Sequence, residues 1–274
     1  GADSTAMALS LRLDQRQEDC LAIDVGTNGE MYLAQHGVLI ACSAAAGPAF
    51  EGAKISCGMR AEEGAITAAE IDPSEGKLKF RTVGDAKPRG LSGSGLVSTV
   101  AALLDAGVVS PSGRYARNSS VPAAFQSRLR GDGPRREFLL AEGNGSADVT
   151  LTQRDLRELQ LAKAAIAAGF RRMLEFGGLK VSQVEHLYLA GAFGSHLDPR
   201  ASVRIGLLPG LPVERVVPIG NAAGSGAKMA VYSRAMRQVA ADIAAKTRYI
   251  ELSSDARFNE LFVEEMAYPE GARF

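Results

Sequence analysis

The sequence has no tryptophan and little cysteine. Its three cysteines in 274 residues are Cys20, Cys42 and Cys57. They are odd in number and widely spaced, so they form neither a C-x-x-C zinc motif nor the ligand set of an iron–sulfur cluster. This pattern is typical of reduced thiols in a cytoplasmic protein.

An excess of charge of either sign is also missing, because 31 basic residues balance 31 acidic ones. Proteins that bind nucleic-acid phosphates need a basic surface, so this balance argues against a nucleic-acid partner. No apolar run reaches the roughly 18–20 residues of a membrane span, and we expect no signal peptide. We therefore expect a cytoplasmic, globular protein of one large domain or two small ones.

The most informative stretch is residues 21–33, where an apolar run ends at Asp24 and Gly-Thr-Asn-Gly precedes a second, alternating run. Asn-Gly between two such runs predicts a hairpin with a type I′ turn. Gly26 permits close approach of a ligand, and the amides of the turn can face an anion. A carboxylate beside such amides suits a phosphate bound with Mg²⁺. The alternative, a hairpin in which Asp24 only caps the turn, stays open at this point.

The rest of the chain predicts an α/β fold. A short helix at 3–13 precedes the hairpin, and a third strand at 38–42 completes an antiparallel meander. The chain begins abruptly inside that helix, so we expect a fragment of a longer protein. The further expected elements are strands at 65–71 and 77–83 around a turn at 72–76, a helix from 90–96 to about 106, a helix at 153–176, strands at 184–190 and 213–219, a helix from 220 through 236, a strand at 249–252 and a C-terminal helix.

Small residues follow two of the expected strands. Gly191-Ala192-Phe193-Gly194 lies between a buried strand and a short helix, the position at which α/β folds bind nucleotides. Residues 220–227 open the next helix with small residues that let it pack closely on a neighbour. The Ala-rich stretch 43–52 is expected to be a connecting loop, with a surface for a cofactor or partner at Ser43 as the alternative.

Three further expectations concern polar residues. A capping box predicts the start of the helix at 153, and its polar face, with Arg157, Lys163, Arg171 and Arg172, is expected to be solvated. His36 and His196 fit turn or capping residues better than catalysts. The stretch 111–148 is expected to be an irregular insertion with one or two strands near 136–141.

Several motifs together resemble one family. The meander followed by alternating helices resembles the ribonuclease-H-like lobe of the actin/sugar-kinase/Hsp70 (ASKHA) superfamily. From about residue 1 to 267, the chain resembles the C-terminal part of the reductive activators of corrinoid proteins. The motifs that carry this resemblance are residues 22–30, 44–52, 92–96, 189–194, 206–209 and 220–227.

The resemblance implies a function. Members of this family couple ATP binding and hydrolysis to reduction of a corrinoid cobalt from Co(II) to Co(I), which rescues oxidised methyltransferase systems. The electron comes from a 2Fe–2S cluster in an N-terminal ferredoxin-like domain. Expected partners are a corrinoid protein and a second copy of the chain in a homodimer.

The resemblance also assigns residues. Asp24 would be catalytic and would bind Mg²⁺ through phosphate or water. Gly26, Thr27 and Asn28 would complete the second phosphate motif. The remaining assignments are the adenosine motif Gly191, Ala192, Phe193 and Gly194, a second connecting helix that starts at Asn221, and Ser43 facing partner or cobalt.

Two departures from the family limit this expectation. The sequence has one Asp-x-Gly-Thr motif where the family has another in a preceding lobe, and it lacks the plant-type cluster spacing. We therefore expect residues 1–274 to be one ASKHA-like domain without the cluster and without the first lobe, and unable to carry out the full reaction by itself. The alternatives are a non-catalytic binding or dimerisation module and a small-molecule kinase, which would need a substrate-side base and a complete cleft.

Overall fold

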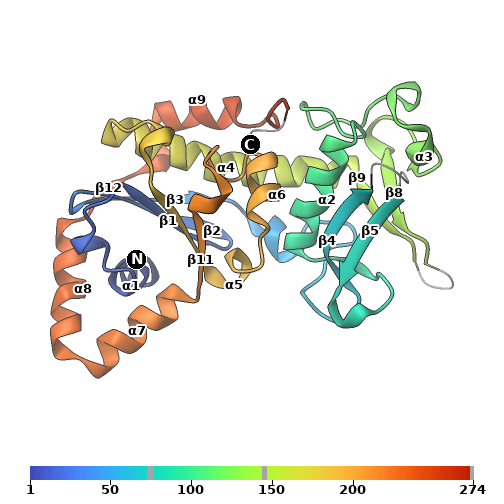
Figure 1. Cartoon of the computed structure of the whole chain (residues 1–274). Helices are drawn as coiled ribbons and strands as arrows, with labels where there is room; N and C mark the ends of the chain where they lie inside the picture. Colours follow the sequence, from blue (N-terminus) through green and yellow to red (C-terminus); the bar gives the residue numbers. More distant parts are fainter. Residues whose placement is uncertain (73–76, 144–146, 272–274) are drawn as a thin grey trace.

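A six-stranded mixed sheet forms the centre of the computed structural model, which describes residues 1–72, 77–143 and 147–271 (Figure 1). Its strand order is β11-β10-β1-β2-β3-β12. The strands are β1 Cys20–Val25, β2 Asn28–Gln35, β3 Val38–Ala45, β10 His186–Ala190, β11 Val216–Gly220 and β12 Arg248–Ile250. β1, β2 and β3 form the predicted antiparallel meander, and β10 and β11 run parallel to β1. The expected α/β class is confirmed.

Helices cover both faces of this sheet (Figure 1). α4 (Gln153–Gly177) and α9 (Ala256–Glu264) lie on one face, and α1 (Ala2–Ser10), α7 (Ala222–Tyr232) and α8 (Arg234–Lys246) lie on the other. Because side chains alternate along a strand, Leu21 and Ile23 join the core under α4, whereas Cys20 and Ala22 join the core against α1. The sheet therefore separates two apolar cores, and every residue of β1 has a defined side.

A second part of the chain is inserted between β3 and α4 (Figure 1). It contains two three-stranded sheets, β5-β4-β6 and β7-β8-β9. Its elements are β4 Ala65–Asp72, β5 Lys77–Thr82, β6 Gly90–Leu91, α2 Gly93–Asp105, α3 Ala123–Gln126, β7 Leu129–Arg130, β8 Glu137–Ala141 and β9 Val149–Thr152. The expected pair of strands is confirmed, although residues 73–76 of its turn lie outside the described residues. The stretch 111–148 is more regular than expected, because β7 and β8 belong to a sheet that β9 completes.

The polar face of α4 is only partly solvated: Arg157 is exposed as predicted, but Lys163 is not. The capping box of Thr152 and Asp155 and the left-handed C-cap Gly178 bound the helix as expected. Lys163, however, is fully buried, and its Nζ donates to the carbonyl oxygen of Ala267 at 2.6 Å. The C-terminal segment covers the part of the predicted face that carries Lys163. Periodicity could not show this, because the covering segment is more than a hundred residues away in sequence.

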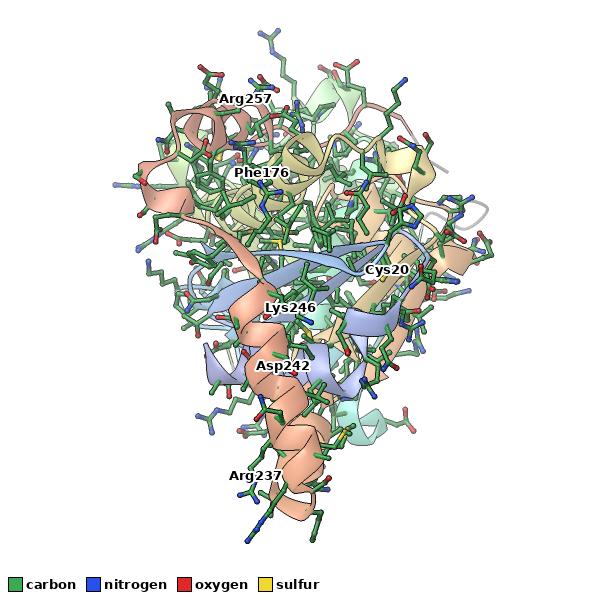
Figure 2. All side chains as sticks on the ribbon, turned by 90° about the vertical axis from the view of Figure 1, so that its left-hand side faces the viewer. Cys20, Phe176, Arg237, Asp242, Lys246 and Arg257 are labelled. Carbon is green, nitrogen blue, oxygen red and sulfur yellow. The ribbon has the colours of Figure 1, made fainter. Side chains whose placement is uncertain are left out.

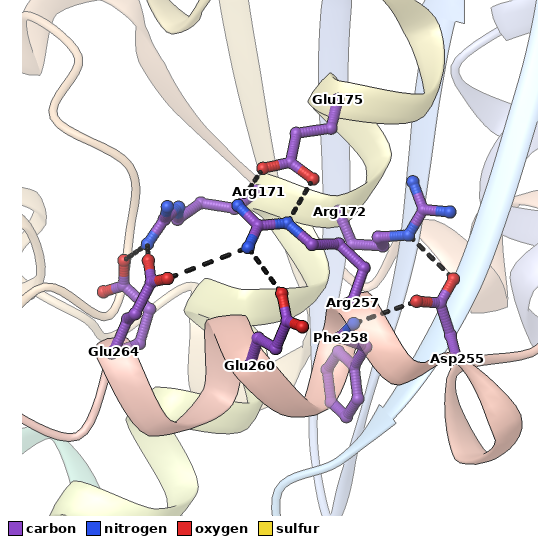
Figure 3. Close-up of polar contacts among 9 residues, drawn as sticks. Arg171, Arg172, Glu175, Asp255, Arg257, Phe258, Glu260 and Glu264 are labelled. Atoms are coloured by element: carbon purple, nitrogen blue, oxygen red, sulfur yellow. Dashed lines mark hydrogen bonds and ion pairs between the residues drawn. The ribbon is translucent and has the colours of Figure 1, made fainter.

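Ion pairs join α4 to α9 (Figure 3). Arg171 pairs with Glu264 and Glu265, and Arg172 pairs with Asp255 at 2.7 Å. Arg257 of α9 returns two hydrogen bonds to Glu175 of α4, at 2.8 and 3.1 Å. The guanidinium of Arg257 lowers the pKa of Glu175. Burial raises the pKa of Asp255, but hydrogen bonds from the Phe258 amide and from Arg172 outweigh it, so this pKa is also lowered.

These lowered pKa values predict an acid-sensitive attachment of α9. A carboxylate whose pKa is lower in the folded state stabilises the fold above its unfolded value, ~4, and this contribution is lost as the pH falls through the folded value. Asp255→Asn keeps a capping oxygen and removes the charge, so it should cost about 1 kcal/mol at pH 7 and nothing near pH 2. Denaturant unfolding at both pH values tests this. A cost that does not change with pH, or an equal cost for Asp242→Asn on exposed α8, would contradict it.

Several element boundaries differ from expectation, most clearly those of α1 and of the helix expected from 220 through 236. α1 begins at Ala2 with Gly1 as its N-cap and ends at Ser10 rather than at 13. The single helix expected through 236 is two helices, because Ser233 is extended (φ −135°, ψ 121°) and caps α8 by accepting from the Met236 amide. Figure 2 shows α8 leading away from the sheet, with Lys246 near the sheet and Arg237 at the far end. No helix in the described part of the chain is long and apolar enough to cross a membrane.

Candidate functional site

The predicted phosphate and adenosine motifs meet at one edge of the central sheet. Asp24 near the end of β1 is in register with Ala190 at the end of β10, so its carboxylate lies against Gly191. A Cβ at Gly191 would overlap Asp24 Oδ1, and Gly191 has a φ of +90°, which favours glycine. Strand β11 ends beside them at Gly220, and Asn221 follows. The parallel strands thus bring Asp24, Gly191 and Asn221 to the same edge.

The Asp24 carboxylate is partly buried and has no internal donor. Among the described residues, no N–H or O–H group donates a hydrogen bond to it. Burial raises the pKa of Asp24, and the nearby charge of Asp3 on α1 adds to the effect. A desolvated carboxylate without a protein partner fits Mg²⁺, which binds proteins through one or two carboxylates and keeps water or phosphate as its other ligands.

Glu30 is a site residue that the sequence analysis missed. It is directly opposite Asp24 in the β1–β2 register and directly opposite Ser43 in the β2–β3 register. Asp24, Glu30 and Ser43 therefore form a row across three strands, on the face covered by α1 and α8. Burial, and to a lesser degree Asp24, raises the pKa of Glu30. The turn predicted at Asn28-Gly29 would have placed Leu33 opposite Asp24, so the register predicted from the sequence could not reveal Glu30.

Ser43 and Glu30 also line a cavity of about 500 Å³ between the sheet, α1 and α8, together with Asp3, Tyr32 and Tyr249. This cavity places Ser43 on the opposite face of the sheet from α4.

The turn between β1 and β2 is not the predicted type I′ turn on Asn28 and Gly29. Both residues already belong to β2, and neither Gly26 nor Gly29 has a positive φ. Gly29 is small for a different reason: a Cβ there would lie 3.1 Å from Ile166 of α4. The turn is made by Gly26 and Thr27.

The polar groups of this turn are used unequally. The Gly26 amide donates to the Asn28 carbonyl at 2.9 Å, so it is not available to an anion. The prediction that this amide faces an anion is therefore wrong. The Thr27 carbonyl accepts from the Gly47 amide at 2.9 Å, and the Thr27 hydroxyl donates to Glu51. The Thr27 amide has no acceptor among the described residues. Thr27 is therefore the residue of this turn whose N–H is available to a ligand.

The adenosine motif folds as a short helix, α5 (Gly191–Gly194), directly after β10. The Phe193 ring stacks on Phe50 with centroids 5.1 Å apart, and a Cβ at Gly93 would lie 2.7 Å from that ring. Phe193 thus packs against the chain itself. Because residues 191 and 194 are glycines, the backbone at the end of β10 is not covered by side chains at these two positions. A ribose or purine bound at this strand end would lie against that backbone.

Asn221 has a local role at the start of α7. Its Oδ1 accepts from the Gly224 amide at 2.7 Å, so it caps the helix. Further along α7, a Cβ at Gly226 would overlap the Ala6 carbonyl oxygen of α1. This close contact confirms the prediction that small residues let this helix pack tightly on a neighbour.

No group of three or more His, Cys, Asp or Glu side chains in the described residues, at this edge of the sheet or away from it, could by itself hold a metal ion. The three cysteines are free thiols. Burial raises the pKa of Cys20 and of Cys42 to about 12, so both are protonated. His36 occupies the β2–β3 turn with a φ of 47°, as expected of a turn residue.

The chain is similar to several known proteins. A family model described as the C-terminal domain of RACo, the ASKHA domain, matches residues 18–273. The corrinoid activation enzyme RamQ of Eubacterium limosum is 35% identical over 268 residues, which are 96% of this chain and 44% of that protein. The Co(II) methylated amine-specific corrinoid protein reductase of Methanosarcina barkeri is 27% identical over 296 residues, 98% of this chain and 49% of that protein.

A solved structure, a reductive activator for corrinoid, iron-sulfur protein, superposes with a TM-score of 0.87 at 38% identity. The match covers 97% of this chain and 42% of that one, so the chain spans about half the length of the relatives that it matches. The family match, the meander with two parallel strands, and the meeting of both motifs at one sheet edge agree with one another. The chain belongs to the family of the C-terminal ASKHA domains of the reductive activators of corrinoid proteins.

Proposed function

We propose that this chain supplies part of a Mg²⁺–ATP site that drives reduction of a corrinoid protein from Co(II) to Co(I), in support of corrinoid methyltransferases. The observation that carries the proposal is the position of the Asp24 carboxylate beside Gly191, with only Val25 between it and the turn that holds the Thr27 amide. Within the described residues, neither the carboxylate nor this amide has a hydrogen-bond partner. The printed names of the relatives, a corrinoid activation enzyme and a Co(II) corrinoid protein reductase, support the choice of substrate.

Each residue has a defined task in this proposal. Asp24 holds Mg²⁺ through water or phosphate, and the bound ion would neutralise phosphate charge. Thr27 donates its amide to a phosphate oxygen, a preorganised dipole of the kind that stabilises phosphoryl groups. Asn28 lies beside that donor at the start of β2. The backbone at Gly191, Ala192 and Gly194 contacts the adenosine, and Asn221 fixes the start of α7 at the same edge.

We propose that the electron comes from a donor outside the residues of this chain. The free thiols of Cys20 and Cys42 are buried in the two separate cores, and the described residues contain no cluster that could hold a metal. We therefore place the 2Fe–2S donor, and the rest of the nucleotide clamp, outside this chain.

Partner binding tests this division of tasks. The purified chain is mixed with a Co(II) corrinoid protein, a reductant and Mg²⁺–ATP, while light scattering follows mass and visible absorption follows cobalt. We expect a homodimer, a complex with the corrinoid protein, and no Co(I) signal. Co(I) formation by this chain would contradict the placement of the donor elsewhere, and absence of a complex would contradict the corrinoid partner.

A further inference from the structure

A short loop touches the phosphate motif, the adenosine motif and the start of α2. It comprises Gly47, the 3-10 helix η2 (Pro48–Glu51) and Gly52, and we call it the η2 turn. Pro48 at the first helical position sets its start. The sequence favours a loop that only connects two elements, but this loop also makes specific contacts with distant segments of the chain.

One side of the η2 turn holds Thr27. The Gly47 amide donates to the Thr27 carbonyl at 2.9 Å, and the Glu51 carboxylate accepts the Thr27 hydroxyl. Two of the three polar groups of Thr27 are thereby fixed by the η2 turn. The third, the N–H, has no acceptor in the described part of the chain. Fixing the other two groups sets the orientation of this amide.

The other side holds the adenosine motif and the start of α2. Phe50 is buried, and its ring stacks on Phe193 at 5.1 Å with an interplanar angle of 26°. Its carbonyl oxygen lies so close to Gly93 that a Cβ there would overlap it. Phe50 therefore contacts α5 and the Ser-Gly start of α2 at once, while the next residue, Glu51, holds the phosphate turn.

We propose that the η2 turn is the positioning element of the nucleotide site: Glu51 orients Thr27 toward phosphate, and Phe50 sets the adenosine motif through Phe193. This inference rests on the proposed nucleotide binding and adds residues that do not touch the nucleotide. Because Glu51 and Phe50 are adjacent, a shift of this loop displaces the phosphate and adenosine sides of the site together.

Substitutions of Glu51 and of Phe50 should change nucleotide affinity in different ways. Glu51→Ala removes the tether of Thr27, so affinity for Mg²⁺–ATP should fall about tenfold, as expected for one hydrogen bond to a charged group, while affinity for adenosine stays within about twofold. Glu51→Gln keeps an acceptor oxygen and should restore most of the ATP affinity. Phe50→Leu should weaken ATP and adenosine by the same factor. Glu62→Ala, an exposed carboxylate nearby in sequence, is the matched control.

Calorimetric titration of the whole chain with Mg²⁺–ATP and with adenosine gives the ratio of the affinity for Mg²⁺–ATP to the affinity for adenosine. A lower ratio for Glu51→Ala, restored by Glu51→Gln, supports the inference. A wild-type chain that binds nucleotide, together with an unchanged ratio in Glu51→Ala, would overturn the inference and leave the proposed function intact. A wild-type chain that binds no nucleotide would instead contradict the claim that Asp24, Thr27 and the adenosine motif form a nucleotide site in this chain, on which the inference rests.

Amide hydrogen exchange tests the tether without nucleotide. The Gly47 amide is held by the Thr27 carbonyl, and the Gly26 amide by the Asn28 carbonyl within the same turn. Glu51→Ala should raise the exchange rates of both amides at least about threefold, whereas Glu62→Ala should not. Unchanged rates in Glu51→Ala would show that Glu51 does not position the turn.

Discussion

Replacing Asp24 by asparagine should weaken Mg²⁺–ATP binding about 100-fold, or ~2.7 kcal/mol, without unfolding the chain. Asparagine has the same shape against Gly191 but lacks the charge that Mg²⁺ needs. Affinity for adenosine should change little, since the carboxylate acts on the metal and phosphates. Calorimetric titration of wild type and variant, each with and without Mg²⁺, measures the effect.

The same substitution should not destabilise the fold. Burial raises the pKa of Asp24, which means that the folded state disfavours its charge. A raised carboxylate pKa lowers stability as pH rises through the interval between the unfolded and folded values, and the whole penalty is present at neutral pH. Asp24→Asn should therefore match or exceed the wild-type free energy of unfolding at pH 7.

The binding experiment has its own control. Unchanged ATP affinity in Asp24→Asn, or the same loss of ATP affinity in the distant control Asp242→Asn, would refute the role of Asp24.

The second large effect is expected at Gly226 in α7. Helix propensity predicts that Gly226→Ala stabilises the helix by about 1 kcal/mol. The structure predicts the opposite, because the new methyl group would overlap the Ala6 carbonyl oxygen, which is backbone and cannot rotate away. Forced separation of α1 and α7 should cost about 1–3 kcal/mol in the free energy of unfolding.

Denaturant unfolding followed by circular dichroism decides the sign of this effect. Gly210→Ala is the matched control, because a Cβ at Gly210 meets nothing within 4 Å. We expect a lower midpoint for Gly226→Ala and an unchanged one for Gly210→Ala. A stabilised Gly226→Ala would mean that α1 does not cross α7 as described.

Local patterns in the sequence predicted the sheet and its longest helix well. The alternation through 21–33, the capping box at Thr152 and the glycine after α4 act within a few residues, so their effects do not depend on the rest of the fold. The strand ending at Ala190 and the small residues after it likewise predicted the edge at which Asp24 and Gly191 meet.

Contacts between distant segments could not be predicted in this way. Lys163 follows the polar period of α4, yet it is buried because the carbonyl oxygen of Ala267 supplies an acceptor. The Asn-Gly signal placed the turn two residues too late, because Gly29 is required for packing against Ile166 and not for a positive φ. The tether of Thr27 to Glu51 spans 24 positions of sequence and leaves no periodic trace.

The most direct test is a calorimetric titration of the wild-type chain with Mg²⁺–ATP and with a non-hydrolysable analogue. The proposed site predicts saturable binding of both at one site per chain, in the micromolar range, or about −8 kcal/mol. Absence of binding at millimolar nucleotide would contradict the claim that Asp24, Thr27 and the Gly191–Gly194 segment form a nucleotide site in this chain.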